Sequence, residues 1–326
     1  MTLRDKVTME MLKMHPIPVT LQNPKYTVYY SNYKDNLYCP MDEKAQRAYE
    51  KGEGSETKPR IITKNGVTYT EPAKMASIAS SSAMTFNLLG NGNADILPNG
   101  VFPAGSYSIE YEKQMYTLAS MKKPAHLDAF LSNEPHKTAI FCEMKLFEWL
   151  DNPRKISRTY FNNKYYFETD KLATDFSKNA FAFFTEWAKV LEETNFKRYD
   201  AWQMFKHLLA IYNYTSFVTK DALNKADCNR SMAGKYRDII LVNVVNEFPA
   251  ELIEDAKVRV QYEKALCEER TEAQIFRSTM KECDIASVFN KNCNAEIRVE
   301  YISAKDFAGL LNISENKKEY LKRYYS

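Results

Sequence analysis

The run DIILVNVVNEF, residues 238–248, constrains the fold of this chain more than any other segment. Successive side chains of a strand point to opposite faces of a sheet, so this nearly continuous apolar run places apolar groups on both faces. Strands of that kind occur in sheets that are covered on both sides. The run therefore predicts an α/β protein with helices packed on both faces of a central sheet.

Other segments supply the remaining elements of such a fold. Apolar residues at helical spacing predict helices at 74–89, 201–212 and 251–283. Strand-forming residues predict strands at 106–118, 125–131, 138–147 and 294–303. The central order is therefore helix, three strands, helix, strand. We expect an α/β fold with a mixed central sheet flanked by helices, and the sequence shows no internal repeat.

The segments between and before these elements are more polar. Residues 1–50 show no sustained helical period, which indicates an N-terminal elaboration, and the charged residues 50–59 suit an exposed linker. In residues 61–70, Asn65-Gly66 separates two β-prone runs and predicts a type I′ hairpin. Such a hairpin either enters a DNA groove or lies on the surface without a partner.

A glycine-rich segment, residues 90–105, predicts a long loop because it holds four of the nine glycines and two prolines. It lacks the G-x-x-x-x-G-K-[ST] pattern of a phosphate-binding loop and the third glycine of a dinucleotide fingerprint. We therefore expect no nucleotide cofactor.

The composition narrows the class of protein further. No stretch approaches the ~20 apolar residues of a membrane span, and charges interrupt residues 1–16, unlike a secretory signal. A soluble, cytoplasmic protein is expected.

Six cysteines without a C-x-x-C pair and four histidines favour neither a structural zinc nor a disulfide. The net charge of +3 is compatible with DNA binding, and the 22 tyrosines and 18 phenylalanines are expected mainly in the core, with base stacking as the alternative.

Three charged residues interrupt the predicted strands 125–131 and 138–147. Glu143 and Lys145 are two apart and share a strand face, whereas Met144 points the other way. A hairpin between the two strands would bring Asp128 beside Glu143. Phosphodiester hydrolysis needs a hard divalent ion held by carboxylates and a cation near the attacking water, and this trio supplies both.

A structural reading of the same residues is available. E-x-K is common by chance, and a glutamate–lysine pair can simply occupy a half-exposed strand face. Charges flanked by apolar residues are nevertheless costly unless they pair with each other or with a metal.

The order of elements, with an aspartate on the second strand and E-x-K on the third, resembles the core of the PD-(D/E)XK nucleases. The resemblance covers roughly residues 74–248. The proline of the superfamily's name does not stand beside Asp128 in this chain, and the nearest proline is Pro124. Four segments also resemble a bacterial family described as restriction endonucleases: SSSAMTFNLLGN (80–91), HLDAFL (126–131), IFCEMKLFE (140–148) and WQMFKHLLAIY (202–212).

The resemblance implies roles for individual residues. Asp128, Glu143 and the backbone carbonyl of Met144 would hold Mg²⁺, with Mn²⁺ as a substitute, and Lys145 would orient and help deprotonate the attacking water. Glu112 would complete the acidic cluster or remain a solvated strand residue.

The second helix offers two further candidates. Gln203 and His207, one helical turn apart, resemble the glutamine-bearing second helix of some of these nucleases. They would contact phosphate or the water network, or else face solvent.

Two basic clusters flank the predicted centre and are expected to bind DNA phosphates, unless they are only solvated loops. Their residues are Lys122, Lys123, Arg154, Lys155 and Arg158.

The sequence thus predicts a magnesium-dependent endonuclease acting on double-stranded DNA, of a type II-like restriction or DNA-defence kind, and working as a homodimer because a two-fold axis suits a double-strand break. A repair or recombination nuclease and a non-catalytic DNA-binding module are the alternatives. The expected organisation is an elaboration with linker and hairpin at 1–71, a nuclease core at 72–250 and an extension packed on the core at 251–326.

Overall fold

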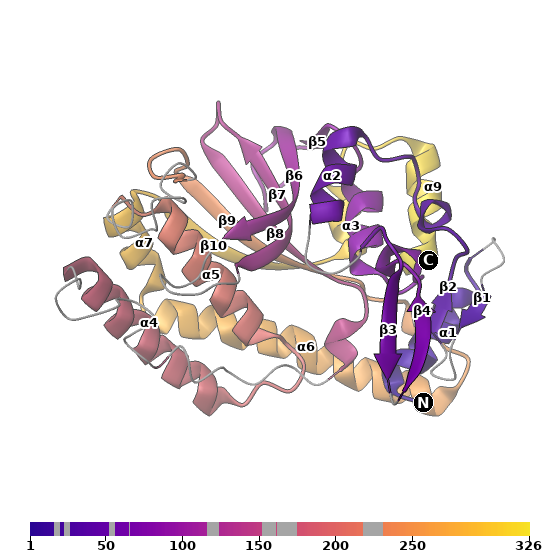
Figure 1. Ribbon diagram of the computed structural model, residues 1–326. Coiled ribbons are helices and arrows are strands. Elements are labelled where there is room, and N and C mark those ends of the chain that lie inside the picture. The colour runs from indigo at the N-terminus through magenta and orange to yellow at the C-terminus, as the bar shows by residue number, and fades with distance from the viewer. Residues whose placement is uncertain are drawn as a thin grey trace.

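A six-stranded mixed sheet forms the centre of the computed structural model, in the order β10-β9-β8-β7-β6-β5 (Figure 1). Strands β5 to β8 pair antiparallel, whereas β8 with β9 and β9 with β10 pair parallel. The strands are β5 (Asn93–Ile96), β6 (Gly105–Met115), β7 (Ala125–Asn133), β8 (Thr138–Lys145), β9 (Asp238–Val245) and β10 (Glu296–Ser303). The expected α/β architecture with a mixed sheet is confirmed.

The structure describes residues 1–15, 20–22, 27–51, 56–64, 66–115, 124–151, 161, 175–217 and 231–326.

Helices cover both faces of this sheet, as the apolar run 238–248 requires (Figure 1). One face packs against α1 (Leu3–Leu12), α2 (Glu43–Lys51), α3 (Ser81–Leu89), α8 (Ala304–Gly309) and α9 (Glu315–Tyr325). The other packs against α4 (Asp175–Thr194), α5 (Ala201–Thr215) and α7 (Ile285–Cys293). The long helix α6 (Ala256–Glu282) contributes to both cores. No helix in the described ranges is long and apolar enough to cross a membrane.

Strand β9 shows why the sheet is covered twice. Ile240, Val242 and Val244 belong to the core on one face, and Ile239 and Leu241 to the core on the other. All five side chains are fully buried. Burial contributes roughly 1.5–3 kcal/mol for each such side chain, so both helical layers stabilise this strand.

The N-terminal residues hold more helix than expected, since α1 and α2 both lie within the first 51 residues. Helix α1 begins with a capping box in which Thr2 and Asp5 bond each other's backbone N–H. Two small antiparallel pairs also occur outside the central sheet: β1 (Thr20–Gln22) with β2 (Thr27–Tyr29), and β3 (Arg60–Lys64) with β4 (Val67–Glu71).

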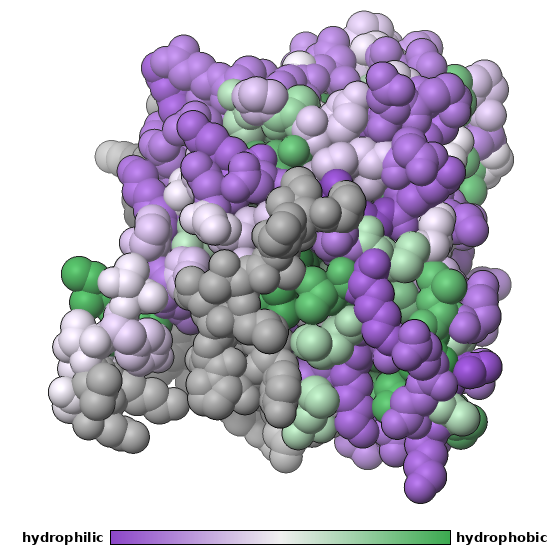
Figure 2. Space-filling view, turned by 90° about the vertical axis from the view of Figure 1, so that its right-hand side faces the viewer, coloured by the Kyte–Doolittle hydropathy of each residue, from purple (hydrophilic) through white to green (hydrophobic). Residues whose placement is uncertain are grey.

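The β3–β4 pair confirms the predicted hairpin. Gly66 has φ +77°, the left-handed conformation that this turn needs, while Asn65 lies outside the described residues. Ile61 is 77% exposed on it. The face of the molecule drawn in Figure 2 is mainly hydrophilic, with scattered apolar residues between the charged ones.

Three other expectations need correction. The helix predicted at 74–89 is a 3-10 turn at Lys74–Ala76 followed by α3, because Ser80 caps α3 by accepting the N–H of Ala83. The predicted loop 90–105 contains β5, which pairs with β6. No element was predicted between residues 147 and 201, but this segment holds α4, whose buried Phe184, Trp187 and Leu191 have helical spacing.

Candidate active site

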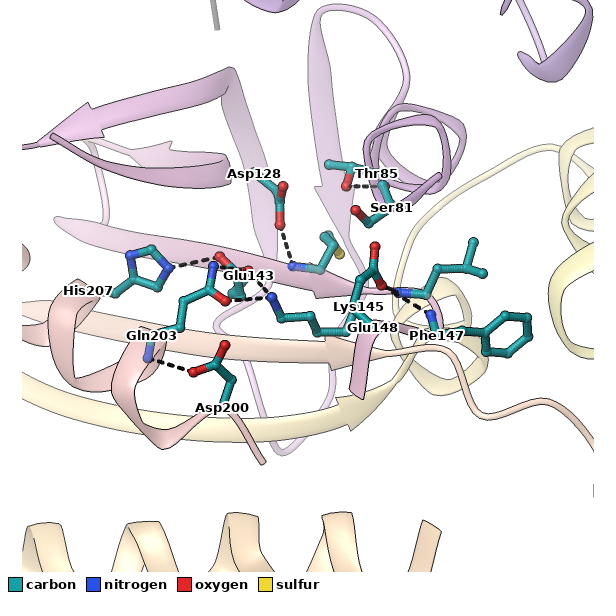
Figure 3. A network of polar contacts seen from close by, with 12 residues as sticks. Ser81, Thr85, Asp128, Glu143, Lys145, Phe147, Glu148, Asp200, Gln203 and His207 are labelled. Carbon is teal, nitrogen blue, oxygen red and sulfur yellow. Dashed lines mark hydrogen bonds and ion pairs between the residues drawn. The ribbon is translucent and has the colours of Figure 1, made fainter. Parts of the chain in front are cut away.

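Strands β7 and β8 separate at the point where the predicted acidic residues lie. Their pairing ends at Ala129 and Cys142, whereas β8 stays paired with β9 as far as Lys145. The backbone N–H of Met144 therefore lacks a strand partner on the β7 side. The Asp128 carboxylate takes that place, accepting this N–H at 2.6 Å (Figure 3).

The same position interrupts the pairing of β7 with β6. Tyr111 pairs with Ala129 and Lys113 with Leu127, but the intervening Glu112 and Asp128 are skipped. Glu112 adopts φ +50°, a left-handed conformation that is uncommon outside glycine. This break changes the sheet face toward which the side chains of β7 point.

The change of face can be followed in the core residues of β7. Ala129 belongs to one sheet-face core and Leu127, two residues away, to the other. Residues two apart in a regular strand share a face, so the strand turns over at Asp128. The two acidic side chains thus sit at a local irregularity of the sheet.

Glu143 is the centre of a buried hydrogen-bonded group on the α5 side of the sheet (Figure 3). Its Oε1 lies 2.7 Å from Lys145 Nζ and accepts the side-chain N–H of Gln203 at 2.6 Å. Its Oε2 lies 2.8 Å from His207 Nε2. Lys145 also donates to Gln203 Oε1 at 2.6 Å.

Helix α5 delivers two of these partners because Gln203 and His207 are one turn apart on the same side. Asp200 caps the helix by accepting the N–H of Gln203 at 3.0 Å. Both residues contact the Glu143 carboxylate rather than facing solvent, and His207 is fully buried. Met144 also points away from Glu143, as predicted, into the opposite core.

The charges of this group settle its protonation. Burial opposes ionisation of Glu143, but the charge of Lys145 and the hydrogen bond with His207 outweigh it and lower the pKa of Glu143 to about 2. Burial also opposes the charge on Lys145, yet Glu143 and Glu148 raise its pKa above the usual value. Burial lowers the pKa of His207 despite its contact with Glu143. At neutral pH we therefore expect a carboxylate, an ammonium and a neutral imidazole.

This protonation refines the role expected of Lys145. In its charged form the Lys145 ammonium can orient a water molecule and stabilise developing negative charge.

Asp128 has the opposite electrostatic environment. Burial and the neighbouring charges of Glu143 and Glu112 raise its pKa well above the ordinary value for aspartate. The N–H of Met144 and the charge of Lys145 favour its ionised form but do not outweigh these effects. A carboxylate in such surroundings is stabilised by a nearby cation.

Glu112 is close enough to affect Asp128, as predicted, but it faces a different space. Its carboxylate lies 3.8 Å from His126 Nδ1, and it lines a cleft of about 590 Å³ beside α2. Burial raises the pKa of Glu112, and the interaction with His126 partly offsets this rise.

A cavity of about 270 Å³ opens beside Glu143 and Lys145. Its wall includes Asn243 of β9, which is in register with Glu143, and Glu269 of α6. Three further wall residues, Arg4, Glu148 and Asp151, also line an adjoining cleft of about 810 Å³. The candidate centre is thus reached from a larger depression between α1 and α3.

The sequence reasoning missed several of these wall residues. Asn243 carried a usable signal, because it is the one polar side chain within the apolar run ILVNVV. Glu148, which accepts the N–H groups of Leu146 and Phe147, and Glu269 carried none, since glutamates are common in such segments.

The described residues fit magnesium in a limited way. They include no group of three His, Cys, Asp or Glu side chains arranged to hold a metal ion. Asp128 and Glu143 supply two carboxylates, and Mg²⁺ is commonly held by one or two carboxylates together with substrate phosphates. The N–H and C=O of one strand residue point to the same strand edge, so the Met144 carbonyl faces the Asp128 side as well. Two carboxylates and one carbonyl would leave the remaining positions around a magnesium ion to water and substrate.

The basic residues expected to bind phosphate, Lys122, Lys123, Arg154, Lys155 and Arg158, lie outside the described residues. Comparison with protein-family models, with curated proteins and with solved structures finds no match for this chain.

Proposed function

We propose that this protein is a magnesium-dependent endonuclease that hydrolyses phosphodiester bonds in double-stranded DNA, in a type II-like restriction or DNA-defence role. One observation carries the proposal: Asp128, Glu143 and Lys145 come from two neighbouring strands at the point where those strands separate, and a cavity opens beside Glu143 and Lys145. A structural ion pair alone would not require the second, electrostatically strained carboxylate of Asp128.

The residues divide the work of hydrolysis in this proposal. Asp128 and Glu143 would hold the metal ion, which when bound neutralises charge on the phosphate and lowers the pKa of water. Lys145 would orient the attacking water with its ammonium. Gln203 and His207 hold the Glu143 carboxylate in place through its two oxygens, and the charge of Lys145 together with the hydrogen bond to His207 keeps the carboxylate ionised.

The partners follow from the chemistry. One centre cuts one strand, so a clean double-strand break favours a homodimer, with α6 and the aromatic-rich flanks as the candidate interface. The basic residues of segments 122–123 and 154–158 would contact phosphates, so their replacement should weaken binding to all DNA sequences alike.

A plasmid assay tests the proposal. Supercoiled and linear DNA are incubated with the full chain in Mg²⁺, in Mn²⁺ and in EDTA. Metal-dependent linearisation is expected, and cleavage restricted to DNA ends would instead favour a repair or recombination nuclease. Glu300→Gln serves as the matched control, because this strand glutamate pairs with Arg277 at the surface, 3.3 Å away.

A second candidate function is a non-catalytic DNA-binding module. It is favoured by the pairing of both Glu143 oxygens with protein groups. DNA binding without cleavage in either metal would support this candidate and contradict the first.

A further inference from the structure

Two oxygen atoms in the cavity wall lack hydrogen-bond partners within the described part of the chain. They are Asn243 Oδ1 and Glu269 Oε2, and their side chains are 3% and 1% exposed. A buried polar atom without a partner costs about 1–3 kcal/mol. Native proteins usually satisfy such atoms with ordered water.

A donor on the opposite wall is also unused. The Lys145 ammonium has three N–H donors, and its described partners are Glu143 and Gln203. The Lys145 side chain is 15% exposed and lines the same cavity. One N–H of Lys145 is therefore left for a group inside that space.

These three groups define the chemistry of an occupant. A metal ion would leave the free N–H of Lys145 without an acceptor, and an anion would leave Asn243 Oδ1 without a donor. Water both donates and accepts hydrogen bonds, so water molecules can satisfy all three groups. The cavity of about 270 Å³ has room for several molecules, because one water takes about 30 Å³ in the liquid.

We propose that this cavity holds a chain of ordered water molecules, anchored by Asn243 and Glu269 and leading to Lys145. Resting on the proposed function, the water at Lys145 is the one that attacks phosphorus. Its oxygen forms a bond to phosphorus while the bond to the leaving oxygen breaks. One proton of that water passes along the chain to solvent, and solvent protonates the leaving oxygen.

Asn243 and Glu269 are positioning residues in this inference, since they touch the water chain and not the DNA. Asn243→Leu and Glu269→Met keep the approximate size of each side chain and remove Asn243 Oδ1 and Glu269 Oε2. Each should lower kcat for cleavage about ten- to hundredfold, because misplacement of a reactant by about 1 Å can cost 10²-fold. The KM for DNA should stay unchanged. Glu269→Gln retains an acceptor and should restore most of the rate.

Asn246→Leu is the matched control. It removes a buried asparagine of the same strand end, bonded to the Tyr324 carbonyl, that does not line the cavity. A fall in kcat as large as in Asn243→Leu, or a rise in KM for the two cavity variants, would overturn the positioning role.

A high-resolution crystal structure of the full chain decides the water chain independently of activity. Water within hydrogen-bond distance of Asn243 Oδ1, Glu269 Oε2 and Lys145 Nζ is expected in the wild type, and loss of the first site in Asn243→Leu. A dry cavity, a metal ion or an anion there would overturn it. Absence of cleavage by the wild type would overturn the proposed function alone.

Discussion

The two ends of strand β8 differ sharply. Its first residues, such as Ile140 and Phe141, are apolar, fully buried and paired with strands on both edges. Its last residues, Glu143 and Lys145, are charged and paired with β9 alone. The first part stabilises the sheet, while the second gives up one row of strand hydrogen bonds and gains space for side chains of another strand and of α5. The comparison teaches that the irregularity of the sheet gives charged side chains from different elements a place to meet.

The largest expected effect is a loss of cleavage activity on substitution at the charged end of β8. Lys145→Met keeps the length of the side chain and removes its charge. Loss of one preorganised donor typically costs about 10²–10³ in rate, or about 3–4 kcal/mol, so cleavage should fall at least that far. Single-turnover cleavage of plasmid DNA measures it. Circular dichroism must show an unchanged fold, and wild-type rates in a folded variant would remove Lys145 from the centre.

At the other end of β8, Ile140→Ala should affect stability more than rate. It leaves a void in a fully buried position, which typically costs about 2–5 kcal/mol of unfolding free energy. Urea denaturation measures this loss. Cleavage well below the unfolding transition should keep its normal rate per folded molecule, and a large fall in that rate would mean that the two ends are not separate.

The pH dependence of stability tests the buried carboxyl group of Glu269 in the cavity wall. Burial and the charge of Glu272 raise the pKa of Glu269 to about 8, from an ordinary 4.5. Between these values the folded protein binds the proton that the unfolded chain has released, so stability falls as pH rises, by up to about 1.4 kcal/mol per unit. The fall ends above pH 8. Glu269→Gln should lack this slope in urea denaturation between pH 5 and 9, and an identical slope would contradict the assignment.

The smallest effect is expected at the surface. Arg277 and Glu300 lie 3.3 Å apart, and the arginine side chain is 49% exposed. Exposed ion pairs contribute about 0–1 kcal/mol, so Arg277→Ala should change the thermal midpoint little. A loss comparable to that of Ile140→Ala would show that surface charge matters far more in this protein than the comparison assumes.

Much of the fold could be predicted because hydrophobic patterning is local. The run 238–248 indicated a strand buried on both faces, and the predicted strands around Asp128 and Glu143 occur close to their expected limits. Strand β5 was missed because its four residues are too short to show a period within a glycine-rich segment. The start of α3 was misplaced because the N-cap residue Ser80, and not the apolar pattern, determines where the helix begins.

The candidate site was predictable only in part. Spacing placed Glu143 and Lys145 on one face, and a hairpin placed Asp128 nearby. The separation of β7 from β8 is set by tertiary packing, so the bond from Met144 to Asp128 left no mark in the sequence. Glu269 reaches the cavity from α6, more than 120 positions away in the chain, and no local pattern reports such a contact.

The most direct test compares Glu143→Gln with Glu300→Gln in Mg²⁺-dependent plasmid cleavage. Glu143→Gln preserves the shape of the side chain, removes the charge that the proposed centre needs and replaces one acceptor oxygen with an NH2 donor. The account predicts metal-dependent cleavage by the wild type and by Glu300→Gln, and none by a folded Glu143→Gln. Equal cleavage by all three proteins would contradict the claim that the separated ends of β7 and β8 carry the chemistry.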